Sequence, residues 1–215
     1  MLELLLADGR TPSGGYAHSG GLEAAIAEGL GAAEVPAFVR ARLHTVGRVQ
    51  AALAVAATAA ADLSGLLALD SEAAARTPAP AVRAADRHLG KGLLRTAAAL
   101  WPSDELLAAY RGASALTPRG VALGVVCHAA GLDSLPAARL SLYEEAAGVA
   151  AAAVKLLPLD GARASGWIAD LASEIEALAR DVAAAGPHTI PSPATPLLDR
   201  RALAHGSREG RLFAS

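Results

Sequence analysis

Apolar side chains recur at intervals of three and four residues along most of the chain, a spacing that predicts amphipathic helices rather than strands. Over residues 35–53, apolar positions follow one helix face and arginines occupy much of the opposite face. From Ala51 to Ala61 nearly every side chain is apolar or small. A helix that is apolar all round must be enclosed by other helices, so we expect this segment at the centre of the fold, with Gly47 as a point of division.

The same spacing predicts further helices, separated by glycine, proline and capping residues. Gly29 and Gly31 end the second helix, and Pro36 suits the first turn of the third. The other expected helices cover residues 2–6, 22–28, 81–100, 121–130, 134–157 and 166–185, with short ones that begin at Ser71 and near Ser103. Beyond Gly186, prolines at four positions preclude a long helix.

These patterns predict an all-α protein with one domain. Residues 1–186 form a bundle of Ala/Leu-rich helices, with a glycine-rich loop at residues 8–21. Residues 187–215 form an extended, Pro-rich and basic tail that ends close to the apolar pair Leu212 and Phe213. Two interpretations of the tail stay open, a disordered chain end or a segment that becomes ordered on binding.

Composition supports the helices and narrows the class of function. Hydrophobic residues make up 53% of the chain but aromatic residues only 3%, so small and aliphatic side chains must build the core and the helices must approach closely. A net charge of −2 gives no electrostatic reason to expect nucleic acid. The longest apolar run is too short to span a bilayer. With a single cysteine, Cys127, and no basic N-terminal region typical of a signal peptide, we expect a cytoplasmic protein without a membrane partner.

The glycine-rich loop is the most unusual stretch of the chain. It combines two Gly-Gly pairs with Pro12, Tyr16 and His18 immediately before a predicted helix. Glycine permits backbone angles that other residues avoid and proline fixes one, so the loop has a defined shape rather than the character of a solvated linker. It could carry function, as such loops often do, or serve as an N-terminal connector.

The residues themselves point to no catalytic, cofactor or metal site. The six histidines include no i, i+4 pair and no second ligand at metal-binding spacing. The chain contains no G-x-x-x-x-G-K-[ST] phosphate loop, and Ala17 breaks the nucleophile-elbow pattern around Ser19. An anion could bind the backbone at the Leu22 helix start, but no lysine lies nearby. The chain therefore reads as a non-enzymatic helical module.

Three separated motifs resemble those of the urease accessory protein UreF family. Residues 12–23, PSGGYAHSGGLE, resemble the opening P-V-G-G-F-S-Y-S-H/Q-G-L-E of that family. Residues 152–159, AAVKLLPL, resemble its A-A-x-K-L-x-P-L-G segment. Residues 196–199, PLLD, and the stretch from His205 through Arg211 to Ser215 resemble its P-L-L-D and H-x₅-R-L-F-R-S. The order and spacing of the motifs cover the chain from near its start to its last residue.

The chain departs from the family pattern at several polar positions. Gly20 stands where the family usually has His or Gln, and His18 stands where it often has Tyr. Asp160 and Gly161 replace a Gly-Gln pair, and Ala214 replaces the penultimate Arg. We expect the polar contacts that these positions make in the family to be lost or rerouted here.

The resemblance implies an all-α homodimer that bridges a UreD/UreH-type accessory protein and the GTPase UreG. The assembly acts on apo-urease while nickel is delivered and the active-site lysine is carbamylated. In this scheme the protein is a scaffold that holds no cofactor, and it is a possible regulator of GTP hydrolysis rather than an enzyme. An alternative is a metallochaperone that binds nickel through His18 or His205 across the dimer.

Two hypotheses assign residues to partners. In the first, residues 190–215 order against the UreD-like protein, with an arginine and two apolar side chains as anchors. In the second, Lys155 and the glycine-rich loop face UreG; the alternative for Lys155 is an ordinary lysine near the negative end of a helix dipole. The residues expected to contact partners or shape their surface are Tyr16, His18, Glu23, Lys155, His205, Arg211, Leu212 and Phe213.

Overall fold

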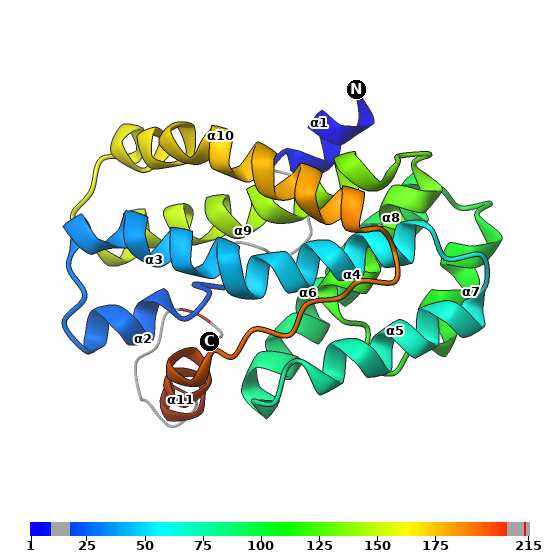
Figure 1. The fold of residues 1–215 in the computed structure, drawn as a ribbon, viewed down its shortest axis with the longest axis horizontal. Helices are drawn as coiled ribbons and strands as arrows, with labels where there is room; N and C mark the ends of the chain where they lie inside the picture. The colour runs from blue at the N-terminus through cyan, green and yellow to red at the C-terminus, as the bar shows by residue number, and fades with distance from the viewer. Residues whose placement is uncertain (10–17, 206–212, 214–215) are drawn as a thin grey trace.

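The computed structural model describes residues 1–9, 18–205 and 213, and within these ranges it contains helices and no strand (Figure 1). The predicted all-α fold is confirmed. The helices are α1 (Leu2–Ala7), α2 (Leu22–Ala27), α3 (Val35–Arg42), α4 (Arg48–Thr58), α5 (Leu63–Ala75), α6 (Pro80–Leu100), α7 (Glu105–Ala113), α8 (Arg119–Ala129), α9 (Ser134–Leu156), α10 (Gly161–Ala185) and α11 (Pro196–His205). No helix among the described residues is long and apolar enough to cross a membrane.

Helix α4 lies at the centre, as the run of small apolar residues predicted. All but the first of its 11 residues are buried, and it packs on α8 and α9. One cluster of buried side chains joins α4 to α3, α9 and α10, and a second joins it to α5, α6, α7 and α8. Because α4 contributes to both clusters, it connects the two halves of the bundle.

Two glycines of α8 permit its close approach to α4. A Cβ atom placed on Gly124 would lie 2.4 Å from the carbonyl oxygen of Ala54 and 2.5 Å from the Cβ of Ala57. A Cβ on Gly120 would lie 2.6 Å from the side-chain oxygen of Gln50. Neither distance is compatible with a real side chain, so the two helices can be this close only because glycine occupies both positions.

The helix that the sequence predicts from Pro36 onward is divided, as expected, just before α4. Residues Leu43–Gly47 form a π-helical segment between α3 and α4. A π-helical turn places one extra residue in the helix and shifts the face that follows it. Gly47 is buried there, and a Cβ on it would lie 3.2 Å from the carbonyl oxygen of Arg42.

Two helix starts differ from the prediction. Ser71 does not begin a short helix, because α5 already begins at Leu63, where the side chain of Asp62 accepts a hydrogen bond from the Gly65 N–H at 2.9 Å. The last long helix begins at Gly161 rather than residue 166, and the side chain of Asp160 caps it by accepting from the Ala162 N–H at 3.0 Å. In both cases an aspartate caps a helix in a stretch that glycine made look like a turn.

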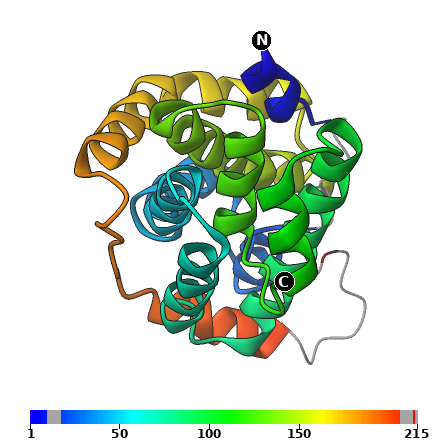
Figure 2. The ribbon, with the colours of Figure 1, turned by 90° about the vertical axis from the view of Figure 1, so that its right-hand side faces the viewer.

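The tail contains a helix and packs on the body of the same chain. Residues 187–195 have no regular structure, and α11 then lies against α2 and α6 (Figures 1 and 2). Pro196 is the first residue of α11, a position where the missing N–H of proline costs nothing. The guanidinium of Arg76 donates to the carbonyl oxygens of Ile190 at 3.2 Å and Pro191 at 3.0 Å. Arg201 pairs at 2.8 Å with Glu28, the residue that follows α2.

Replacing Gly124 with Ala should destabilise the protein by about 1–3 kcal/mol, because the added methyl group forces α8 away from α4. The midpoint of urea unfolding measures the change. Gly166→Ala is the matched control, since Gly166 lies within α10 with nothing within 4 Å of an added Cβ. That variant should be stabilised by about 0.5–1 kcal/mol through helix propensity. Equal effects of the two substitutions would contradict the close approach.

Candidate functional site

Three of the residues predicted to contact partners lie together, although they come from three distant motifs. The backbone N–H of Phe213 donates a hydrogen bond to Glu23 Oε2 at 3.1 Å. The Nζ atom of Lys155 lies 5.4 Å from the centre of the Phe213 ring, over its face. The ring is 5% exposed and packs with the cluster that contains α3, α9 and α10. We call Glu23, Lys155 and Phe213 the motif junction.

Local structure explains the positions of Glu23 and Lys155, the two charged residues of the junction. Gly20 and Gly21 have positive φ angles of 60° and 83°, which turn the chain into α2. Glu23 is in the first turn of α2 and Lys155 is in the last turn of α9, so each charge complements the dipole of its own helix. The N–H of Glu23 also lies 3.4 Å from Ser19 Oγ, its acceptor. In the resulting site Phe213 contacts the Glu23 carboxylate through its backbone N–H and the Lys155 ammonium through its ring.

The other predicted residues are placed elsewhere or not at all. His18 is buried, and its ring centre lies 6.2 Å from that of His88 on α6. Tyr16, Arg211 and Leu212 lie outside the described residues, as does the side chain of His205. Within the described part of the chain, no three histidine, cysteine, aspartate or glutamate side chains are arranged to hold a metal ion.

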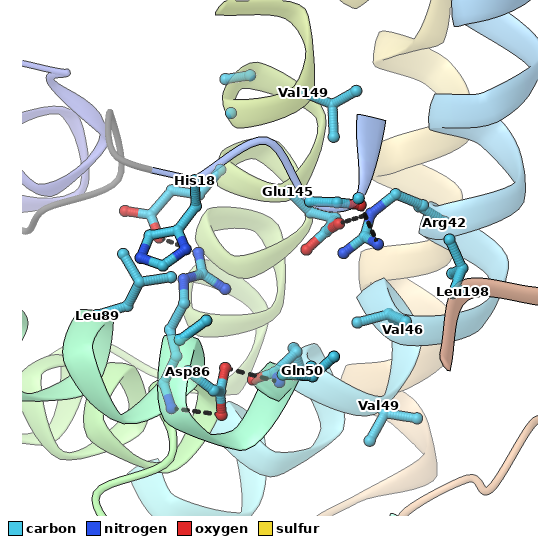
Figure 3. A pocket seen from close by; sticks show the side chains of 18 of the residues that line it. His18, Arg42, Val46, Val49, Gln50, Asp86, Leu89, Glu145, Val149 and Leu198 are labelled. Carbon is cyan, nitrogen blue, oxygen red and sulfur yellow. Dashed lines mark hydrogen bonds and ion pairs between the residues drawn. The ribbon is translucent and has the colours of Figure 1, made fainter. Parts of the chain in front are cut away.

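A cavity of about 480 Å³ lies next to the glycine-rich loop (Figure 3). Helices α4, α6 and α9 form its walls, and the described ends of the loop and the tail helix α11 complete it. Its lining combines aliphatic side chains with polar and charged ones. The aliphatic side chains labelled in Figure 3 are Val46, Val49, Leu89, Val149 and Leu198.

Charged side chains line the interior of the cavity in two ion pairs, which meet at neighbouring residues of α9 and which we call the network. Arg42 pairs with Glu145 of α9 and also donates to the carbonyl oxygen of Gly20 at 2.6 Å (Figure 3). Arg119 of α8 pairs with Glu144, the neighbour of Glu145. The network therefore ties the glycine-rich loop to the middle of α9 through a single arginine.

Asp86 of α6 completes the network. Its carboxylate accepts hydrogen bonds from the Gln50 side chain at 3.2 Å and from the backbone N–H of Arg119 at 3.0 Å (Figure 3). Burial raises the pKa of Asp86 above its usual range, although those hydrogen bonds oppose the shift. Burial likewise raises the pKa of Glu144, against the attraction of Arg119. Burial therefore makes it costly in free energy to keep Asp86 and Glu144 ionised beside the cavity.

Sequence reasoning missed this network. It assigned Arg42 to the polar face of its helix, whereas the side chain is mostly buried against Glu145. A signal was available in α9, where Glu144 and Glu145 interrupt a long run of apolar and small residues. Charges inside such a run are rarely buried unless they are paired, so the pair predicts arginine partners from other helices.

Two departures from the family motif have a structural context here. A side chain at Gly20 would approach the Arg42 guanidinium and Val149 to 3.2 Å, so either group would have to shift by a few tenths of an ångström. Asp160, in place of glycine, is the residue that caps α10. Glycine at position 20 therefore leaves room for the contact of Arg42 with the loop, and aspartate at position 160 adds a helix cap.

Asp86→Asn tests the cost of the buried carboxylate. Because the pKa of Asp86 is higher in the folded than in the unfolded chain, the folded state binds the proton more tightly. The stability of the unsubstituted protein relative to the variant should therefore rise as pH falls from neutral to about 4, by at most ~1.4 kcal/mol per pH unit. Urea unfolding of both proteins across this range measures the difference. A difference that is independent of pH, or that falls with acidification, would contradict the assignment.

Comparison with known proteins agrees with the motifs. The UreF family profile matches residues 30–172, more than half of the chain. The chain is similar to the urease accessory protein UreF of Mycolicibacterium vanbaalenii, with 38% identity over 219 residues, and to that of Mycobacterium sp. (strain JLS), with 41% over 214 residues. It is also similar to UreF of Mycobacterium bovis (strain BCG / Pasteur 1173P2), with 39% identity over 220 residues. Each match covers 99% of this chain and 97% of the relative.

The matches to these relatives extend beyond the profile, over the glycine-rich loop, helix α2 and the tail, and thus include Glu23 and Phe213 of the motif junction. The chain belongs to the UreF family of urease accessory proteins.

Proposed function

We propose that this protein is a non-catalytic scaffold for urease maturation. It bridges a UreD/UreH-type accessory protein and the GTPase UreG while nickel is inserted into apo-urease, and it influences GTP hydrolysis by UreG. In this proposal it works in the cytoplasm as a homodimer. The observation that carries the proposal is the motif junction, because residues of three motifs that lie far apart in the chain meet there.

The chemistry of the junction suits protein recognition. Lys155 is exposed and Glu23 is half-buried, so charged groups of both signs border an apolar ring. Exposed charged groups of this kind are typical of the polar border of a protein interface. The cavity network supports the same role indirectly, because Arg42 holds the loop from which α2 and Glu23 start.

The tail provides the first test of the proposal. Deleting Arg208 to Ser215 removes the apolar anchors and Arg211, and it should abolish co-purification with the UreD-type partner. Leu203→Ala is the control, because it removes an exposed apolar side chain from α11 and leaves the deleted segment in place. Undiminished co-purification of the truncated chain would exclude the tail as the binding segment.

Lys155→Ala tests the surface proposed for UreG. Loss of one charge-assisted hydrogen bond should weaken binding of UreG about tenfold or more, with a matching loss of urease activation in a reconstituted mixture. Lys91→Ala is the control, since Lys91 is the only other lysine and is also exposed on a helix. If GTP turnover and activation by the Lys155 variant equal those of the control, Lys155 is an ordinary lysine at a helix end.

A further inference from the structure

The cavity beside the glycine-rich loop has the size and the lining of a small-molecule site. Its volume of about 480 Å³ lies within the range of about 300–1,000 Å³ that is typical of ligand pockets. One face of α6 forms a wall of it, because the lining positions of this helix repeat at intervals of three and four residues. Asp86 is the charged residue of that face, with Val82 one turn before it and Leu89 and Leu93 one and two turns after it.

The charges that line the cavity do not balance. The described lining residues include five carboxylates and three arginines, namely Asp8, Asp86, Glu144, Glu145 and Asp199, and Arg42, Arg76 and Arg119. Two of the arginines pair with glutamates of α9, and Arg76 pairs with Glu72 outside the cavity. Asp86 accepts its hydrogen bonds from uncharged groups, the Gln50 amide and a backbone N–H. The cavity is therefore complementary to a positively charged ligand.

Gln50 places a second polar group beside Asp86. The residue is 7% exposed and lines the cavity, and its amide nitrogen donates to Asp86 at 3.2 Å. Its side-chain oxygen is buried and accepts no hydrogen bond from the described part of the chain. A buried acceptor without a donor costs free energy, which an N–H group of a ligand beside Asp86 would recover. An anionic head group would instead meet acceptors and carboxylates at this place.

We propose that the cavity binds a small organic cation, with a primary ammonium or guanidinium head group on an aliphatic body. The head group lies at Asp86 and Gln50, whose hydrogen bond is seen in Figure 3. The aliphatic body lies along α6 towards Leu93, a distance of about 10 Å along the helix, which suits a chain of about six carbon atoms. Binding needs no partner protein, so this site is additional to the scaffold function.

Isothermal titration calorimetry of the full chain with six-carbon probes tests the class of ligand. Hexylammonium should bind, and neutral hexanol should bind at least tenfold more weakly because it lacks the charge that faces Asp86. Hexanoate should show no measurable binding. Butylammonium should bind about tenfold more weakly than hexylammonium, because two fewer methylene groups are buried. Absence of hexylammonium binding, or equal affinity for hexylammonium and any one of the other three probes, would overturn the proposal.

Asp86→Asn tests the position of the head group. The substitution removes the charge and keeps the shape, so the affinity for hexylammonium should fall at least tenfold, whereas that for hexanol should stay within about twofold. Asp170→Asn is the matched control, since it removes one negative charge from an exposed position of α10. It should leave the affinities for both probes unchanged. An equal loss of hexylammonium affinity in the two variants would show a general charge effect and overturn the site at Asp86.

Filling the cavity gives a test that does not depend on charge. Ala85 lines the cavity next to Asp86, whereas Ala84 is exposed on the same helix. Ala85→Leu should weaken the binding of hexylammonium and hexanol at least fivefold by occupying their space, and Ala84→Leu should change neither. Circular dichroism verifies that each variant is folded, and this pair decides the location if Asp86→Asn does not fold. Undiminished binding to folded Ala85→Leu would overturn the cavity as the site and leave the scaffold function intact.

Discussion

The close packing of α4 on α8 is the contact on which the positions of the other helices depend. Gly120 and Gly124 let the backbones approach, and the buried alanines of α4 keep the same separation along its length. Helix α4 is buried on all sides. Small side chains at its surface therefore set how closely each neighbouring helix packs, and large interlocking side chains are not needed. A core with few aromatic residues achieves its density in this way.

This packing determines where the charged network forms. Gln50 enters from the first turns of α4 and the Arg119 backbone from the start of α8, so their common hydrogen-bond partner, Asp86, is fixed relative to both helices. Arg119 then reaches α9 through Glu144. Removal of one partner would leave a buried charge uncompensated, which costs far more than the pair contributes. The network therefore specifies the geometry of the helices around the cavity more than it adds to stability.

The succession of helices along the chain could be predicted from the sequence because helix faces and caps are local signals. Residues 81–100 and 134–157 were predicted almost to their ends, where a change of period or a proline marks the boundary. The start of α5 was missed because Gly65 looked like a break, although Asp62 caps the helix through its N–H. The positions of residues 190–201 depend on contacts with Arg76 and Glu28, which lie more than a hundred residues away in the chain. Such contacts leave no local pattern.

In the candidate site too, local patterns identify single residues but do not predict the contacts between them. Glu23, Lys155 and Phe213 could each be selected from a motif, but their meeting depends on how α2, α9 and the tail are placed by the core. The network of Arg42 and Glu145 was not predicted, since an arginine on the polar side of a helix is usually solvated. Both features arise from long-range packing, which periodicity alone does not encode.

Covalent attachment explains how weak contacts can keep the tail on the body of the chain. A tethered segment meets its binding surface at an effective concentration on the order of millimolar, so contacts that would be negligible between separate molecules become well populated. Residues 190–205 can therefore lie against the body of the same chain through contacts that are individually weak.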